Sequence, residues 1–150
     1  MYKTMQELNK YLDTFNIIIK DLSEYQSNIK LGGTLILKTL GLNFSRTVGD
    51  LDLIISNPTK EQETYLKALK FFNQEGGSPG PNNFKFKKNN LYLNILCVYD
   101  TKSTDIVFYE YNKVKYSLFL INEIIDAKKK YSRKKDIQDF LILKNENFNL

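Results

Sequence analysis

The sequence predicts an α/β (α+β) fold, with a mixed central sheet flanked by helices and with further helices toward the C-terminus. Two observations predict it. Helical spacing comes first, then strand and helix patterns alternate, then helical spacing returns, and residues 50–56 form a nearly all-apolar strand. No repeat, linker or low-complexity tract divides the 150 residues. A chain of this length can bury roughly two thirds of its unfolded surface around one core, so we expect residues 1–150 to form a single domain.

The N-terminal segment has the pattern of a helix followed by a short strand. Thr4-Met5-Gln6-Glu7 matches a capping box, which predicts a helix start. Apolar residues then recur at helical spacing and predict one amphipathic helix of about five turns; they are Leu8, Leu12, Phe15, Ile19 and Leu22. A strand at 29–31 leads into Gly32 and Gly33, and a short helix over 35–40 is predicted to end at Gly41.

Residues 50–56 are the strongest strand prediction, and their apolar character places the strand in the middle of the sheet. Asn57 is predicted to cap the next helix, with Pro58 at its first position and its end near Gln74. The glycine- and proline-rich residues 76–81 are predicted to form a loop.

Two hairpins are predicted downstream. Phe84 and Phe86 alternate with lysines up to an Asn89-Asn90 turn, after which apolar residues alternate with Tyr92 and Asn94. A second strand pair, 105–111 and 113–120, turns at Asn112. The tyrosines and phenylalanines at such spacings are expected to be core residues and not a base-stacking surface.

Helical patterns return at the C-terminal end. Asn122 is predicted to cap a helix that runs to about Tyr131, and residues 135–143 are predicted to form a last one.

Composition excludes several chemistries. Cys97 is the only cysteine and there is no histidine, so an internal disulfide, a Cys/His zinc site and a Ser-His or Cys-His nucleophile pair are excluded. Any metal must be held by oxygen ligands, which suit Mg²⁺, Mn²⁺ or Ca²⁺. The formal charge of +5 favours partners that carry phosphate groups.

The start of the chain and its apolar runs bear on location. No apolar run reaches the length of a membrane span, and the polar residues after Met1 do not resemble a signal peptide. We therefore expect a cytoplasmic protein with no membrane contact.

Two carboxylates lie one residue apart on the central strand. Successive side chains of a strand alternate faces, so Asp50 and Asp52 share a face while Leu51 and Leu53 enter the core. Paired carboxylates repel each other unless a cation lies between them, and paired Mg²⁺ ions are a recurring device of phosphoryl transfer. Gly32-Gly33-Thr34 precede a helix, and a glycine turn at a helix start offers backbone N–H groups to a triphosphate.

With these residues the chain resembles the minimal nucleotidyltransferases of the polymerase-beta superfamily, and most of all the AbiEii-type toxin-like proteins. The first block of matching positions consists of Gly32, Gly33, Thr34, Arg46, Asp50 and Asp52. A second block, in residues 124–140, is similar to that family's later basic and acidic pattern and consists of Lys128, Arg133, Lys135, Asp136 and Asp139. The two blocks occur in the family's order.

The resemblance implies a role for each block. Catalysis is assigned to Asp50, Asp52 and Lys128, with Mg²⁺ or Mn²⁺ held by Asp50, Asp52 and Asn94. An NTP is bound by the remaining positions, namely Gly32, Gly33, Thr34, Arg46, Arg133, Lys135 and Asp136. The acceptor is an RNA 3′ end, a protein or a small molecule, and an antitoxin-like protein is an expected partner.

The chain departs from the family where a third carboxylate usually stands. Asn94 occupies that position, and an amide offers a metal an oxygen but no charge, which weakens a second metal and the general base most. Asp100, Asp105 or Glu110 are possible substitutes from other strands. Val48 also replaces a Ser or Thr common in the family, with Thr47 beside it.

Three functions stay open at this point. The first is an active nucleotidyltransferase, the second a catalytically impaired relative that binds nucleotide, RNA or a partner, and the third a structural domain. Simpler interpretations also exist: Asp50 pairing with Arg46, and the basic run 128–135 as a solvated helix end with Asp136 and Asp139 paired at the surface.

Overall fold

The structure is a computed structural model of the chain. It describes residues 2–25, 28–39, 49–72, 83–99, 107–119, 121–131, 134, 137–139 and 141.

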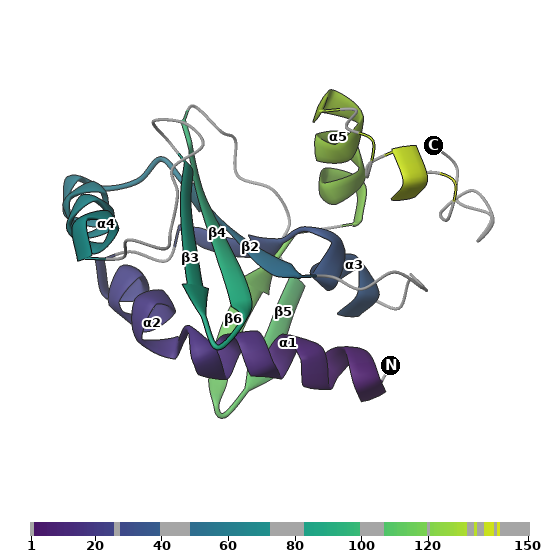
Figure 1. Cartoon of the computed structure of the whole chain (residues 1–150), viewed down its shortest axis with the longest axis horizontal. Helices are drawn as coiled ribbons and strands as arrows, with labels where there is room; N and C mark the ends of the chain where they lie inside the picture. Colours follow the sequence, from purple (N-terminus) through teal and green to yellow (C-terminus); the bar gives the residue numbers. More distant parts are fainter. Residues whose placement is uncertain are drawn as a thin grey trace.

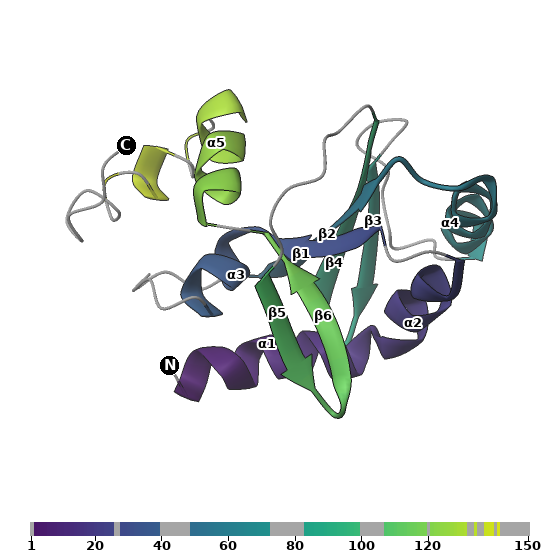
Figure 2. The same ribbon diagram turned by 180° about the vertical axis from the view of Figure 1, so that it is seen from behind.

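Six strands form one mixed sheet in the order β3-β4-β2-β1-β6-β5 (Figures 1 and 2). The strands are β1 (Ile29–Gly32), β2 (Asp50–Ser56), β3 (Asn83–Lys88), β4 (Leu91–Val98), β5 (Val107–Tyr111) and β6 (Val114–Leu118). The pairs β2–β4 and β1–β6 are parallel, and the other neighbours are antiparallel. The α+β class and the central place of β2 are thus confirmed.

The N-terminal region is two helices and not one. The five-turn helix predicted from its spacing is divided at Phe15 into α1 (Tyr2–Thr14) and α2 (Asn16–Tyr25). Phe15 is buried, and backbone hydrogen bonds from Phe15 to Tyr11 and from Ile19 to Phe15 bridge the break. The bend lets α1 pack against α3 (Thr34–Thr39) while α2 packs against α4 (Lys60–Phe72).

Three predicted helix starts are wrong. The first helix begins at Tyr2, so Thr4 lies inside it and is not its cap. Asn57 has a φ of 50° and precedes α4, which begins at Lys60, so Thr59 caps that helix. The last fully described helix, α5 (Ile121–Tyr131), begins one residue before Asn122. The start of a helix depends on which side chain reaches the free N–H groups of its first turn, and assigned helix ends vary by one or two residues.

Both predicted hairpins are present, each with a two-residue turn. Asn89 and Asn90 join β3 to β4 with φ of 52° and 63°, and Asn112 and Lys113 join β5 to β6 with φ of 51° and 64°. Positive φ at both positions is the twist that connects two adjacent antiparallel strands, and asparagine adopts it at low cost. Part of the predicted strand 105–111, the loop 76–81, Gly41 and most of the predicted helix 135–143 lie outside the described residues.

One face of the sheet carries the core. Leu51, Leu53 and Ile55 of β2 are fully buried, and α1 and α2 run along this face (Figure 1). Two tyrosines of the β5–β6 hairpin fasten it to α1: the Tyr109 hydroxyl donates to Asn9 at 2.6 Å, and the Tyr111 hydroxyl to Asp13 at 2.9 Å. None of the described helices is both long enough and apolar enough to cross a membrane.

A buried glutamine ties three segments together. Gln62 is fully buried, and with Thr59 it forms a reciprocal capping box: Thr59 Oγ1 accepts from the Gln62 N–H at 3.1 Å, and Gln62 Oε1 accepts from the Thr59 N–H at 2.9 Å. Its Nε2 donates to the Leu22 carbonyl at 3.1 Å and to Asn28 Oδ1 at 2.8 Å. The helix start of α4 is therefore joined to the end of α2 and to the residue before β1.

Replacing Gln62 with Leu should lower the free energy of unfolding by roughly 3 kcal/mol, because several buried partners lose their hydrogen bonds at once. Urea unfolding measures the change. Gln6→Leu on the exposed face of α1 is the matched control and should stay within about 0.5 kcal/mol of wild type. Equal losses in both variants would contradict the role given to Gln62.

Candidate functional site

The two aspartates of β2 lie on the face opposite the core. Along β2 every second residue is buried, so Asp50 and Asp52 are half-buried and point away from Leu51 and Leu53. The strand prediction and the shared face of the carboxylates are confirmed. Two carboxylates so placed require a hydrogen-bond donor or a cation between them.

Asn94 of β4 provides such a donor. The parallel pairing of β2 with β4 sets Asp52 opposite Asn94. The Asn94 side-chain nitrogen donates to Asp50 Oδ2 at 2.5 Å and to Asp52 Oδ1 at 3.2 Å. One amide group therefore bridges both carboxylates, at the position where the family resemblance expects a metal ligand.

The predicted glycine turn lies against the same carboxylate. Gly33 has a φ of 87°, and a Cβ on it would lie 2.6 Å from Asp52 Oδ2. A side chain there is excluded both by backbone strain and by contact with Asp52. The Gly33 carbonyl accepts from Ile36 and Leu37, so α3 begins directly after it. The turn, the helix start and the carboxylate thus form one local unit.

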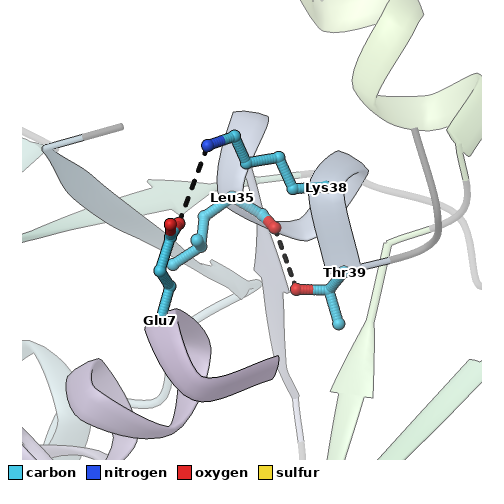
Figure 3. Close-up of polar contacts among 4 residues, drawn as sticks. All are labelled: Glu7, Leu35, Lys38 and Thr39. Carbon is cyan, nitrogen blue, oxygen red and sulfur yellow. Dashed lines mark hydrogen bonds and ion pairs between the residues drawn. The ribbon is translucent and has the colours of Figure 1, made fainter. Parts of the chain in front are cut away.

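The helix behind the turn is held by an ion pair to α1, by a hydrogen bond within its own last turn and by buried apolar side chains. Lys38 of α3 forms an ion pair with Glu7 of α1 at 3.7 Å, and the Thr39 hydroxyl donates to the Leu35 carbonyl at 2.9 Å (Figure 3). Leu35, Ile36 and Leu37 are fully buried. The helix α3, which begins directly after Gly33, is therefore packed into the core, and this packing positions the turn.

The two motif blocks meet at Thr34. Asp139 is fully buried, and the Thr34 hydroxyl lies 3.5 Å from Asp139 Oδ2 as a hydrogen-bond donor. The interpretation of Asp139 as a surface residue is therefore wrong, because the carboxylate is enclosed beside the start of α3. The helix α5 also reaches this side of the sheet, since it packs against α3 and its Glu123 lies 3.9 Å from Lys30 of β1.

Several predicted site residues cannot be located in this way. Arg46, Arg133, Lys135 and Asp136 lie outside the described residues, as does the side chain of Lys128, whose backbone belongs to α5. In the basic run, Lys129, Lys130 and Lys134 are exposed.

No third carboxylate joins the pair within the described part of the chain. Glu110 lies on β5, three strands from β2, and pairs in register with Lys115. Strands are about 4.8 Å apart, so Glu110 cannot substitute for Asn94. Asp100 and Asp105, like Thr47 and Val48, lie outside the described residues. The described residues contain no cluster of three or more His, Cys, Asp or Glu side chains suited to a metal.

The donor set still fits a hard divalent cation. Asp50 and Asp52 offer carboxylate oxygens on one face, the donors that Mg²⁺ and Mn²⁺ prefer. A half-turn of the Asn94 amide would direct its oxygen, instead of its nitrogen, at the same place. A cation bound at this place would have two charged ligands and one neutral ligand.

Two titratable side chains of the core, Tyr11 and Cys97, stay neutral at neutral pH. Burial, together with the negative charges of Asp50 and Glu7, raises the pKa of Tyr11 to about 12. Burial raises the pKa of the Cys97 thiol to about 11, with the charge of Glu63 adding to the effect. Neither group supplies an anionic nucleophile at neutral pH.

Three residues beside the carboxylates were not predicted as functional. Lys85 and Lys87 of β3 lie with their ammonium groups 4.8 and 5.6 Å from the centre of the Tyr92 ring on β4. Tyr92 is only half-buried and lies opposite Asp50 in register, so the expectation that such tyrosines are core is wrong for it. The alternation in both strands and their tight turn were enough to place all three on the face of Asn94.

Comparison of the chain with protein-family models, with curated proteins and with solved structures finds no match.

Replacing Gly33 with Ala should lower the free energy of unfolding by about 2 kcal/mol, since it introduces both a strained φ and a contact with Asp52. Gly49→Ala is the matched control, because a Cβ there meets nothing within 4 Å, and the substitution should leave stability unchanged or raise it by up to about 1 kcal/mol. Thermal and urea unfolding of both variants make the comparison. A neutral Gly33→Ala would show that the turn is not tied to Asp52.

Proposed function

We propose that the chain is a metal-dependent nucleotidyltransferase that moves an NMP from an NTP onto an acceptor hydroxyl. The observation that carries the proposal is the unit of Asp50, Asp52 and Asn94 on one face of the sheet, with the Gly33 turn against Asp52. A packed scaffold that holds two carboxylates beside a glycine turn suits phosphate chemistry.

The cofactor of the proposed reaction is Mg²⁺ or Mn²⁺, held by the carboxylates of Asp50 and Asp52 with the Asn94 amide oxygen as a neutral ligand. When bound, such an ion supplies positive charge to the triphosphate and to the pyrophosphate that leaves.

The proposed roles of the other residues follow the two blocks. The turn of Gly32 and Gly33 and the start of α3 at Thr34 accommodate the triphosphate on the β1 side of the carboxylates. Lys128 neutralises phosphate charge, as do three basic positions matched by the resemblance, Arg46, Arg133 and Lys135. Asp136 is a further nucleotide contact. Asp139 acts through Thr34 by holding the start of α3.

In the proposed reaction the acceptor oxygen forms a bond to the α-phosphorus of the NTP. The bond from that phosphorus to the oxygen bridging toward the β-phosphorus breaks, and pyrophosphate leaves on the opposite side. The proton of the acceptor hydroxyl passes to an aspartate oxygen or to water. The acceptor is an RNA 3′ end, a protein side chain or a small molecule, and the proposed setting is the cytoplasm, with an antitoxin-like protein as a partner.

A second candidate function is a binding protein that has lost catalysis. The observation that favours it is the Asn94 amide, which satisfies both carboxylates without a cation. In this case the same face binds a nucleotide, RNA or a protein partner and transfers nothing.

The decisive experiment supplies each α-labelled NTP in turn, with Mg²⁺ or Mn²⁺, to total RNA and total protein. Label transferred by wild type and lost in Asp52→Asn would support the enzyme and identify the base and the acceptor class together. Glu61→Gln at the exposed start of α4 is the control, because it also removes one negative charge, in a helix that contributes no residue to the site, and should keep the activity. No transfer under any condition would reject the catalytic proposal.

Asn94→Asp should test the proposed metal site by a readout other than turnover. Without a divalent cation the variant should be less stable than wild type by about 2 kcal/mol, because two donated hydrogen bonds become charge repulsion. Added Mg²⁺ or Mn²⁺ should then raise its Tm more than that of wild type or of Asn16→Asp, an exposed control.

Equal cation effects on the three proteins would contradict a metal site at these residues. Transfer activity that appears only in Asn94→Asp would favour the second candidate for the natural chain.

A further inference from the structure

A cationic cluster lies on the sheet beside the carboxylates. Lys85 and Lys87 are two residues apart on β3 and therefore point to the same face, and both ammonium groups approach the Tyr92 ring. We call Lys85, Lys87 and Tyr92 the β3–β4 cluster.

The register connects this cluster directly to the site. Tyr92 pairs with Asp50 across β4 and β2, and Lys85 pairs with Asn94 across β3 and β4. Tyr92 lies on β4, one strand from the carboxylates of β2, and the two lysines lie on β3, two strands and roughly 10 Å from β2. The cluster lies on the β4 side of β2, whereas the Gly33 turn follows β1 on the other side of β2 (Figure 2).

The charge of the cluster is not balanced within the described residues. Ion pairs there join Lys30 to Glu123 and Lys38 to Glu7, and neither Lys85 nor Lys87 has a described carboxylate within ion-pair distance. The two ammonium groups lie 4.8 and 5.6 Å from the centre of one ring, so two positive charges share this patch of the sheet and favour an anion with more than one charged group.

We propose that the β3–β4 cluster binds the backbone of a single-stranded nucleic acid whose terminal hydroxyl is the acceptor. The assignment as acceptor rests on the proposed function. In-line transfer requires the acceptor to enter opposite the leaving pyrophosphate, and a triphosphate at the Gly33 turn leaves the β4 side for it. Two lysines spaced along a strand match successive phosphates, and an aromatic ring beside them offers a stacking surface for a base.

An acidic polypeptide matches the cluster less well, because carboxylates make no use of the Tyr92 ring face. Lysines on an edge strand also discourage pairing with another chain, and β3 is at the edge of the sheet. That role does not require both ammonium groups to gather over a ring on the neighbouring strand.

The test measures binding apart from catalysis, by fluorescence anisotropy of a short fluorescein-labelled RNA strand and of the same sequence as DNA. Lys85→Gln combined with Lys87→Gln should weaken binding of the strand about tenfold and reduce the slope of log affinity against log salt by about 1.4, the value for two lost phosphate contacts. Tyr92→Leu should also weaken binding about tenfold.

The matched control combines Lys10→Gln with Lys20→Gln, which removes the same charge from exposed positions of α1 and α2. It should keep both the affinity and the salt slope. Thermal unfolding of each variant establishes that it is folded, and Mn²⁺ and NTP binding are titrated separately on the same proteins.

Equal weakening in both lysine pairs, or no binding by wild type, would overturn the proposal. So would weaker NTP binding with an unchanged strand affinity, which would move the lysines to the triphosphate, or equal displacement of the strand by poly-glutamate, which would favour a polypeptide. A third outcome distinguishes the two proposals. If the cluster variants specifically lose strand binding but wild type transfers no label, the nucleic-acid surface is supported. Its use as an acceptor site and the proposed enzyme are then both rejected.

Discussion

The parallel pairing of β2 with β4 is the constraint on which the rest of the site depends. On its core side β2 buries Leu51, Leu53 and Ile55. A shift of the strand by one residue would turn these side chains outward and bring Asp50 and Asp52 into the core. Apolar packing therefore fixes the register, and the register sets Asp52 opposite Asn94. The site is positioned by a face of the strand that takes no part in it.

The amide at position 94 gives the carboxylate pair two compatible states. With its nitrogen turned to Asp50 and Asp52, the pair is satisfied by hydrogen bonds alone. With its oxygen turned there, the same side chain complements a cation. A third carboxylate would be strongly tied to metal occupancy, because without an ion three negative charges would face one another. Asn94 makes the scaffold stable in either condition, and both proposed functions are consistent with that property.

Much of the sheet follows from local sequence signals. The bounds of β2 were predicted from its apolar pattern, and both hairpins from alternation around asparagine turns. What escaped prediction depends on partners distant in the sequence. The break at Phe15 reflects the different helices against which α1 and α2 pack. Thr59 is recognised as a cap only through its exchange of hydrogen bonds with Gln62. The buried Asp139 has its hydrogen-bond partner, Thr34, more than a hundred residues earlier in the sequence. In the site, Asp50, Asp52 and Gly33 were predicted from residue type and spacing. Tyr92 was wrongly expected to be a core residue, because a tyrosine on a strand suits the core and the surface equally well.

The order of the strands also bears on how the chain folds. The hairpins β3–β4 and β5–β6 lie at the two ends of the sheet, and each closes over a two-residue turn, so each can form within microseconds. The parallel contacts that join them to β2 and β1 link residues far apart in sequence and carry the larger loop-closure entropy. Asp50 and Asp52 meet Asn94 only in that slow, non-local step. Before it the two carboxylates and the amide belong to separate pieces of chain, so the site comes into existence with the folding transition itself and has no precursor in the hairpins.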